Sequence, residues 1–305
     1  MTTYESSREP VRGVTPSRVL PLVAAGLLVV GCGGSGGEAA EAHNASKSPT
    51  SQASSADQNP DPAPDPNAPA DGEMIVFYDM ATTPEATNGR NIMQNGQLLE
   101  ELANDINETL RLPHNISLRG SQCDQPNAFW SADDNTITLC YEDADWAQRV
   151  FTEAGDADPT ASALNSEYAT FYHEVGHMAI SIYDLPVTGR EEDVADQLAA
   201  FVLLAPGEDG RADPESVQAV KDFARAFGAS GAQNTVLSAD DFADEHSLDE
   251  TRMYNLECWI YGSDPKANAD LVTSGELPED RASGCQAEWE QLDQAWSTLL
   301  DPYFK

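Results

Sequence analysis

An α+β fold is predicted for residues 74–305, because strand-like segments come first along the chain and helical segments follow. Four short segments are rich in residues that favour strands, and from residue 142 onward the spacing of apolar residues is almost wholly helical. The predicted strands are 74–78, 115–120, 127–131 and 136–141. The domain should therefore consist of a small N-terminal sheet followed by a larger helical part.

Two further elements complete the predicted N-terminal part. The turn residues Ala132 to Asn135 separate the last two strands, so these strands should form a hairpin. A helix of about 91–110 is predicted before the second strand, because apolar residues recur there at helical spacing. These apolar residues are Leu99, Leu102, Ile106 and Leu110.

The first 32 residues have the layout of an export signal. Three arginines precede an apolar run, 19–30, that is too short to span a bilayer comfortably as a helix. The run ends in Val29-Val30-Gly31-Cys32, which resembles the lipobox of bacterial lipoproteins. We therefore expect a lipoprotein signal peptide at 1–32, lipidation of Cys32, and export to the bacterial cell envelope. An ordinary signal peptide with a chance cysteine is the alternative.

Residues 33–73 are predicted to be a disordered tether. They contain no Val, Ile, Leu, Met, Phe, Tyr or Trp, whereas Gly, Ser, Ala, Pro and Asp recur. Such a segment cannot bury enough apolar surface to offset the entropy lost on ordering. The rest, 74–305, is long enough for one domain with a substantial core.

The charge balance is strongly acidic. Removing three basic and two acidic residues with the signal segment, from totals of 16 and 52, leaves 13 basic against 50 acidic residues. This charge repels nucleic acid and anionic membrane surfaces, so we predict no nucleic-acid partner and membrane attachment through the lipid only. Solubility is the simplest explanation of the charge, and a preference for cationic substrates is the second.

Four cysteines remain besides Cys32, an even number for an oxidising compartment. Cys123 and Cys140 flank the predicted hairpin, and Cys258 and Cys285 lie together near the C-terminus. This proximity along the chain favours these two pairs among the three possible pairings. A zinc cluster of all four is disfavoured because no C-x-x-C spacing occurs.

The stretch FYHEVGHMAI, 171–180, carries the strongest functional signal. An apolar stripe predicts a helix over 162–183, and His173 and His177 lie one turn apart on the face opposite this stripe. Two imidazoles so placed can bind one metal ion, and Glu174 can then accept a proton from water. The alternative is a solvent-facing helix with incidental histidines.

A second helix, predicted at 190–204, follows a break caused by the proline and glycine of DLPVTG. Glu192 and Asp196 lie four residues apart on one face of it. A site with two histidines needs a third protein ligand, and a ligating histidine usually donates its far nitrogen to a carboxylate. Glu192 can supply the ligand and Asp196 the carboxylate. Acids that only stabilise the start of a helix are the alternative.

HEVGH followed by EDVAD resembles the H-E-x-x-H plus E-x-x-x-D pair of the gluzincin class of zinc metallopeptidases. The longer stretch FYHEVGHMAISIYDLPVTGREEDVADQLAA resembles a bacterial family of exported metallopeptidases whose function is not established. The likeness extends to CDQPNAFWSADDNTITLCYE and DEHSLDETRMYNLECWIYG. The metzincin pattern is absent, because Ile180 and Tyr183 stand where that class has glycine and histidine.

The resemblance implies a zincin-like α+β fold, bound Zn²⁺, and hydrolysis of a peptide or protein substrate by activated water. It assigns His173, His177 and Glu192 as ligands, Glu174 as general base, and Asp196 as the residue that orients a ligand.

Two further expectations concern the substrate. His246 is a candidate to stabilise the oxyanion, although a structural role suits it at least as well. An extended peptide could add to the sheet near 127–141, where plain core packing is the alternative. The predicted function is a lipid-anchored zinc metallopeptidase. Its rivals are a non-catalytic metal-binding lipoprotein and an adhesin without metal, and no oligomeric state is predicted.

Overall fold

The computed structural model describes residues 71–233 and 236–305. The predicted signal peptide, the lipidation site Cys32 and nearly all of the predicted tether lie outside the described residues. At the described end of that tether, the N–H of Gly72 donates to the carbonyl of Leu112 at 3.1 Å. The domain therefore includes residues just before 74.

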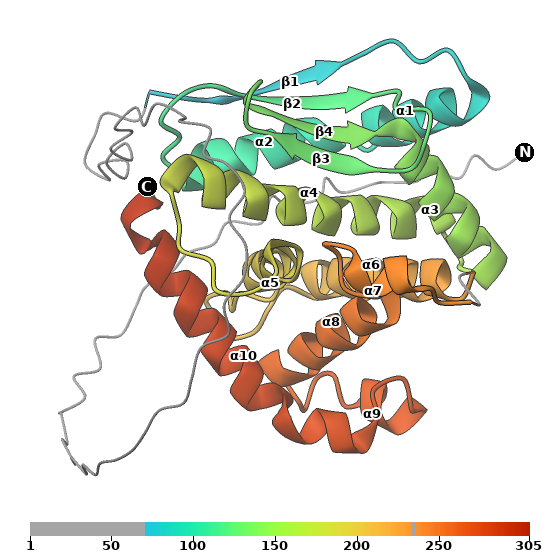
Figure 1. The fold of residues 1–305 in the computed structure, drawn as a ribbon, viewed down its shortest axis with the longest axis vertical. Helices are drawn as coiled ribbons and strands as arrows, with labels where there is room; N and C mark the ends of the chain where they lie inside the picture. Colours follow the sequence, from blue (N-terminus) through green and yellow to red (C-terminus); the bar gives the residue numbers. More distant parts are fainter. Residues whose placement is uncertain (1–70, 234–235) are drawn as a thin grey trace, which may run out of the picture. The chain divides into compact units, whose positions relative to one another are not determined.

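The sheet has four strands in the order β1-β2-β4-β3 (Figure 1). Its strands are β1 (Met74–Tyr78), β2 (Ile116–Ser121), β3 (Ala128–Ser131) and β4 (Thr136–Cys140). β1 and β4 each run parallel to β2, whereas β3 pairs with β4 antiparallel. The predicted hairpin is confirmed, and β3 lies at an edge of the sheet.

Helices make up most of the remaining described residues, so the α+β prediction is confirmed. They are α1 (Pro84–Asn95), α2 (Leu98–Thr109), α3 (Tyr141–Ala154), α4 (Pro159–Tyr183), α5 (Glu191–Leu203), α6 (Pro214–Gly231), α7 (Ala239–Ala243), α8 (Asp249–Ser263), α9 (Asp270–Ser274) and α10 (Glu279–Leu300), followed by the 3₁₀ turn η1 (Asp301–Tyr303).

The single helix predicted at 91–110 is wrong, because two helices occupy this part of the chain. α1 begins at Pro84, where the hydroxyl of Thr83 accepts a hydrogen bond from the N–H of Ala86. The chain then breaks at Gly96 and Gln97, and Gln97 adopts a left-handed φ of 55°. The spacing of apolar residues predicted only α2. A left-handed turn at one residue barely changes that spacing, so the break before α2 was not apparent from the sequence.

α4 lies between the sheet and the helices α5 and α6 (Figure 1). It starts at Asp158, whose carboxylate caps the first turn, and it ends at Asp184 with φ 50°. The predicted apolar stripe faces the core. The opposite face is also covered, because α5 and α6 pack on it, so His173 is only 6% exposed. A solvent-facing helix is thereby excluded.

α5 crosses α4 at very close range. A Cβ atom added at Gly176 would lie 2.8 Å from the Cα of Ala195, closer than real Cβ contacts allow. The short connection between the helices, 184–190, requires this immediate crossing. Glycine at 176 therefore fixes how near α5 can bring its carboxylates to the histidines.

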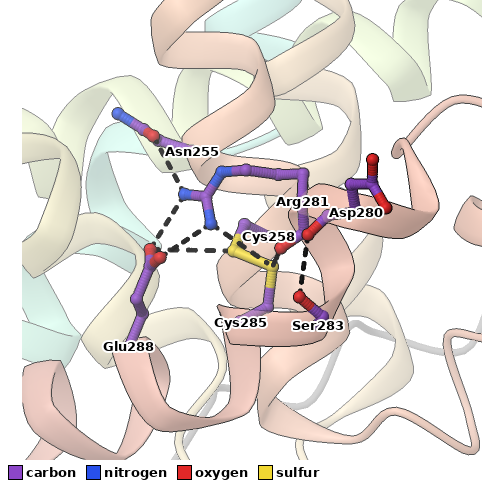
Figure 2. Close-up of a disulfide and its surroundings, with 7 residues drawn as sticks. All are labelled: Asn255, Cys258, Asp280, Arg281, Ser283, Cys285 and Glu288. Atoms are coloured by element: carbon purple, nitrogen blue, oxygen red, sulfur yellow. Dashed lines mark hydrogen bonds and ion pairs between the residues drawn. A yellow bond between two sulfur atoms is a disulfide. The ribbon is translucent and has the colours of Figure 1, made fainter.

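Both predicted cysteine pairs form disulfides. Cys123–Cys140 fastens the loop after β2 to the end of β4, and Cys258–Cys285 joins α8 to α10. Figure 2 shows the guanidinium of Arg281 beside the second disulfide, donating to the carboxylate of Glu288 at 2.7 Å. This second link holds the last long helix against the helix that leads out of the site described below.

Candidate metal centre

His173 and His177 point their Nε2 atoms at each other across 3.2 Å. Their Nδ1 atoms are both engaged from α5: Asp196 Oδ1 lies 2.9 Å from His173, and Glu191 Oε1 lies 2.9 Å from His177. A carboxylate on Nδ1 keeps the proton there and leaves the lone pair on Nε2. Both lone pairs therefore face the same point.

Glu192 supplies a third donor at that point. One carboxylate oxygen is 3.2 Å from His173 Nε2, and the other is 3.4 Å from His177 Nε2. Ligand atoms of these three residues all lie within 4.8 Å of one another. The register chosen from sequence, with Glu192 facing the histidines and Asp196 behind His173, matches the geometry.

The donor set fits a zinc ion. Ligands at about 2.0–2.1 Å from tetrahedral zinc are separated by about 3.3 Å, which is close to the distances between these three groups. His173 and His246 approach the buried Oε2 atom of Glu192 at 3.2 and 3.1 Å, but neither contact has good hydrogen-bond geometry. The Nε2 lone pairs of His173 and His177 and the carboxylate of Glu192 repel one another unless a cation lies between them.

Excess negative charge surrounds the centre. Burial would lower the pKa of His177, but hydrogen bonds to Glu192 and Glu191 outweigh it and raise that pKa to about 9. Burial would raise the pKa of Glu192, but its contacts with the histidines hold that pKa well below its usual range. Such a centre attracts a cation, as a metal site requires.

Arg252 of α8 completes the support behind His173. Its Nε and Nη2 atoms donate to the two oxygens of Asp196, both at 2.7 Å, and both side chains are buried. Burial alone would raise the pKa of Asp196, but the Arg252 charge lowers it to about 2. Asp196 is thus a fixed anion that orients the imidazole.

Sequence reasoning missed two of these residues. The helical spacing does not single out Glu191, which lies in line with Ala195 on α5, yet its exposed side chain bends back to His177. Arg252 carries no local signal, since it lies 56 positions beyond the acid that it binds. The only indication in the sequence of a role for Glu191 is that it is an acid in the first turn of α5.

Glu174 lies beside the donor set and is only 4% exposed. Burial raises its pKa, while the charges of His173 and His177 and a hydrogen bond from the backbone of Trp130 in β3 oppose the increase. A raised pKa brings a carboxylate closer to the pH at which it exchanges protons efficiently. The position suits a general base.

His246, from the loop before α8, reaches the same centre. Its Nε2 atom is 3.1 Å from Glu192 Oε2, and its Nδ1 atom is 2.9 Å from Asp244. Contacts with these two acids raise the pKa of His246 to about 9, despite partial burial. The structure therefore brings together every side chain proposed from sequence for the metal and the reaction.

A cavity of about 810 Å³ opens over the centre. The edge strand β3 lines one side with Phe129 and Trp130, and α6 lines the other with Phe223 and Phe227. An extended peptide in this cavity would lie beside the unpaired edge of the sheet. Of the region 127–141 in which peptide binding was predicted, residues 127–130 line this cavity, whereas the strand β4 is buried.

A helix carrying H-E-x-x-H beneath an edge strand, with a glutamate from the next helix, defines the metallopeptidase type of centre. The chain belongs to the family described as "Putative metallopeptidase", whose model matches residues 78–300. No curated protein and no solved structure matches the chain.

Proposed function

We propose that the protein is a zinc-dependent metallopeptidase that hydrolyses peptide bonds with an activated water molecule. The observation that carries this proposal is the convergence of His173 Nε2, His177 Nε2 and the Glu192 carboxylate beside the buried carboxylate of Glu174. Membership of the metallopeptidase family supports it. Zinc is the proposed metal because a set of two imidazoles and one carboxylate leaves a fourth position for water or substrate.

A bound zinc ion would polarise the scissile carbonyl and make water more acidic. Glu174 then takes the proton of the attacking water on a carboxylate oxygen and delivers it to the leaving amine nitrogen. The backbone of β3 pairs with the extended substrate and fixes the scissile bond over the centre. His246 donates a hydrogen bond from Nε2 to the oxyanion that develops during attack.

Substitution of Glu174 by glutamine tests this assignment. Glu174→Gln should retain zinc and lose nearly all turnover, because it removes the proton acceptor and leaves the coordinating groups in place. Zinc content and cleavage of a peptide library, with a chelator control, measure the two effects. Glu153→Gln, at an exposed position of α3, is the matched control and should behave like the parent protein.

The outcomes separate the rival functions. A non-catalytic metal-binding lipoprotein would hold zinc and cleave no peptide, and an adhesin would hold no zinc. Substantial turnover by Glu174→Gln would show that another group is the base.

We also propose that lipidation of Cys32 anchors the protein to the bacterial cell envelope, on the basis of the lipobox. Within 71–233 and 236–305, no helix has the length and apolar character needed to cross a membrane. Cys32→Ser should release the protein from the membrane fraction on cell fractionation. Continued membrane attachment of that variant would contradict the proposal.

A further inference from the structure

The cavity extends well beyond the candidate metal centre. Thr170 and Ser166 line it three and seven residues before His173 on α4. With a helical rise of about 1.5 Å per residue, Ser166 lies about 10 Å along the axis from His173. The cavity therefore has a second end, which we call the distal pocket.

Aromatic side chains and one acid form the walls of the distal pocket. Trp146 and Asp143 come from α3, and Phe223 comes from α6. Their rings can cover the apolar stem of a guest side chain, whereas Asp143 is the only charged group among these lining residues. The pocket thus combines an apolar passage with a negative end.

Behind Asp143 lies a second acid that has no cation. Glu167 of α4 is 0% exposed, and the partner that its carboxylate meets is the other acid, Asp143. Burial, the charge of Asp143 and a hydrogen bond with Asp143 raise the pKa of Glu167 well above its ordinary value, and burial raises the pKa of Asp143. Among the described residues, no ion pair reaches either acid.

The two acids do not form a metal site. Among the described residues, the only group of three or more His, Cys, Asp or Glu side chains that could hold a metal ion is His173, His177 and Glu192, and the two acids are not part of it. The carboxylate of Asp143 at the cavity wall, with no protein cation beside it, can instead pair with an organic cation. A guanidinium or ammonium group brings its own hydrogen-bond donors and needs only one or two carboxylates.

We propose that the distal pocket is a specificity subsite that binds an arginine or lysine side chain of the peptide substrate, beside the scissile bond. The stem lies between Trp146 and Phe223, and the cationic group binds the carboxylate of Asp143, with Glu167 behind it. Aromatic faces attract such cations, and long basic side chains bury their stems readily. This inference rests on the proposed peptidase function and adds the class of substrate.

The inactive Glu174→Gln protein, loaded with zinc, allows binding to be measured without cleavage. Arginine is moved through each position of a set of hexapeptides, and each peptide is compared with a twin that carries neutral citrulline. Isothermal titration should show one position at which arginine binds at least about 30-fold more tightly, the lower range for a buried charge pair. Citrulline has nearly the same shape, so the difference reports charge.

Two variants locate the effect. Asp143→Asn and Glu167→Gln, each combined with Glu174→Gln, should reduce the preference for arginine to a few-fold. Asp145→Asn is the matched control, because Asp145 lies two residues away on α3 and bonds Asn88 and Arg149 outside the cavity. It removes the same charge and should keep the preference. The comparison of arginine and citrulline peptides is made on Glu174→Gln with Asp143 and Glu167 intact. It therefore does not depend on whether the Asp143 and Glu167 variants fold.

Each result has a separate meaning. Equal binding of arginine and citrulline peptides at every position overturns the subsite, as does a preference that survives Asp143→Asn. Tighter binding of a peptide with an apolar residue at that position would likewise overturn it and identify an apolar subsite. If the active protein binds zinc and cleaves no peptide, the peptidase proposal fails, while the binding preference still decides the subsite.

Discussion

Each histidine of the candidate centre uses one ring nitrogen for orientation and directs the other at the point where the proposed metal would bind. Asp196 is buried and bonded to Arg252, so His173 rests on a rigid pair of charges. Glu191 is 52% exposed and has no such support, so it holds His177 more loosely. The two imidazoles are therefore supported to different degrees by the same helix.

Zinc affinity should follow this order of support. Glu192→Ala should lower it most, because it removes a ligand. Asp196→Ala should lower it by a factor of about 10 to 100, the usual effect of losing a carboxylate behind a ligating histidine. The contact with His177 means that Glu191→Ala should also lower it, by less than Asp196→Ala. Competition with a chelator measures the three dissociation constants, and a ranking with Glu191 most damaging would contradict the register.

Glu257 of α8 should make stability depend on pH. It is 8% exposed, and one carboxylate oxygen has no hydrogen-bond partner. Burial and the nearby Glu276 raise its pKa from 4.5 to about 7. The Glu257 carboxyl group loses its proton at lower pH in the unfolded chain than in the folded protein. Glu257 therefore lowers the free energy of unfolding progressively from pH 4.5 to about 7, and by a constant amount above that pH.

Glu257→Gln removes this cost. Its melting temperature should equal that of the parent protein at pH 4 and exceed it increasingly up to about pH 7, beyond which the difference stays level. Thermal unfolding at several pH values gives the measurement, and Glu290→Gln, at an exposed position of α10, is the control. A difference that does not change with pH would refute the assignment.

At the scale of elements, the crossing of α4 and α5 positions the donor set. All three carboxylates that contact the histidines come from the first two turns of α5. Gly176 lies between the histidines and permits the close approach of Ala195. The geometry of the candidate metal centre therefore depends on a backbone contact as well as on the donor side chains.

Gly176→Ala should push α5 away from α4. Overpacking of this kind costs about 1–3 kcal/mol of stability, and displacement of Glu192 should lower zinc affinity together with it. Gly189→Ala is the control, because a Cβ there meets nothing within 4 Å. Urea unfolding and zinc titration measure both effects. Unchanged zinc affinity in Gly176→Ala would show that the crossing does not set the site geometry.

At the scale of the whole domain, contacts between distant parts of the chain close the structure. The ring of Tyr303 stacks on Tyr183 at the end of α4, with centroids 3.9 Å apart, and the N–H of Arg111 donates to the carbonyl of Tyr303. The last residues thus bind both the sheet side and the central helix. The disulfide between α8 and α10 supports this closure (Figure 2).

Replacing Cys258 and Cys285 together by serine should lower the free energy of unfolding by about 3 kcal/mol, because the unfolded chain gains freedom. Loss of Cys123 and Cys140 should have a similar effect, since the loops span 27 and 17 residues. Urea unfolding with and without a reductant measures both. Equal midpoints for parent and variants would contradict a stabilising role.

Local patterns in the sequence predicted much of this domain. The hairpin follows from alternating strand residues around a turn, and α5 follows from a helix break and a new apolar period. The pair Glu192 and Asp196 follows from the 100° turn per residue of a helix. By contrast, the break at Gln97 and the burial of both faces of α4 were not predicted, because neither changes a local period.

The α+β class, the pairing of the cysteines and the candidate set His173, Glu174, His177 and Glu192 could all be predicted from the sequence, because each depends on residues that are near one another in the chain. Three contacts became apparent only from the folded structure: Arg252 binds Asp196, Glu191 bends back to His177, and Asp143 meets Glu167 beside the cavity. These contacts join different helices. Their geometry depends on how the helices pack, which no local spacing encodes.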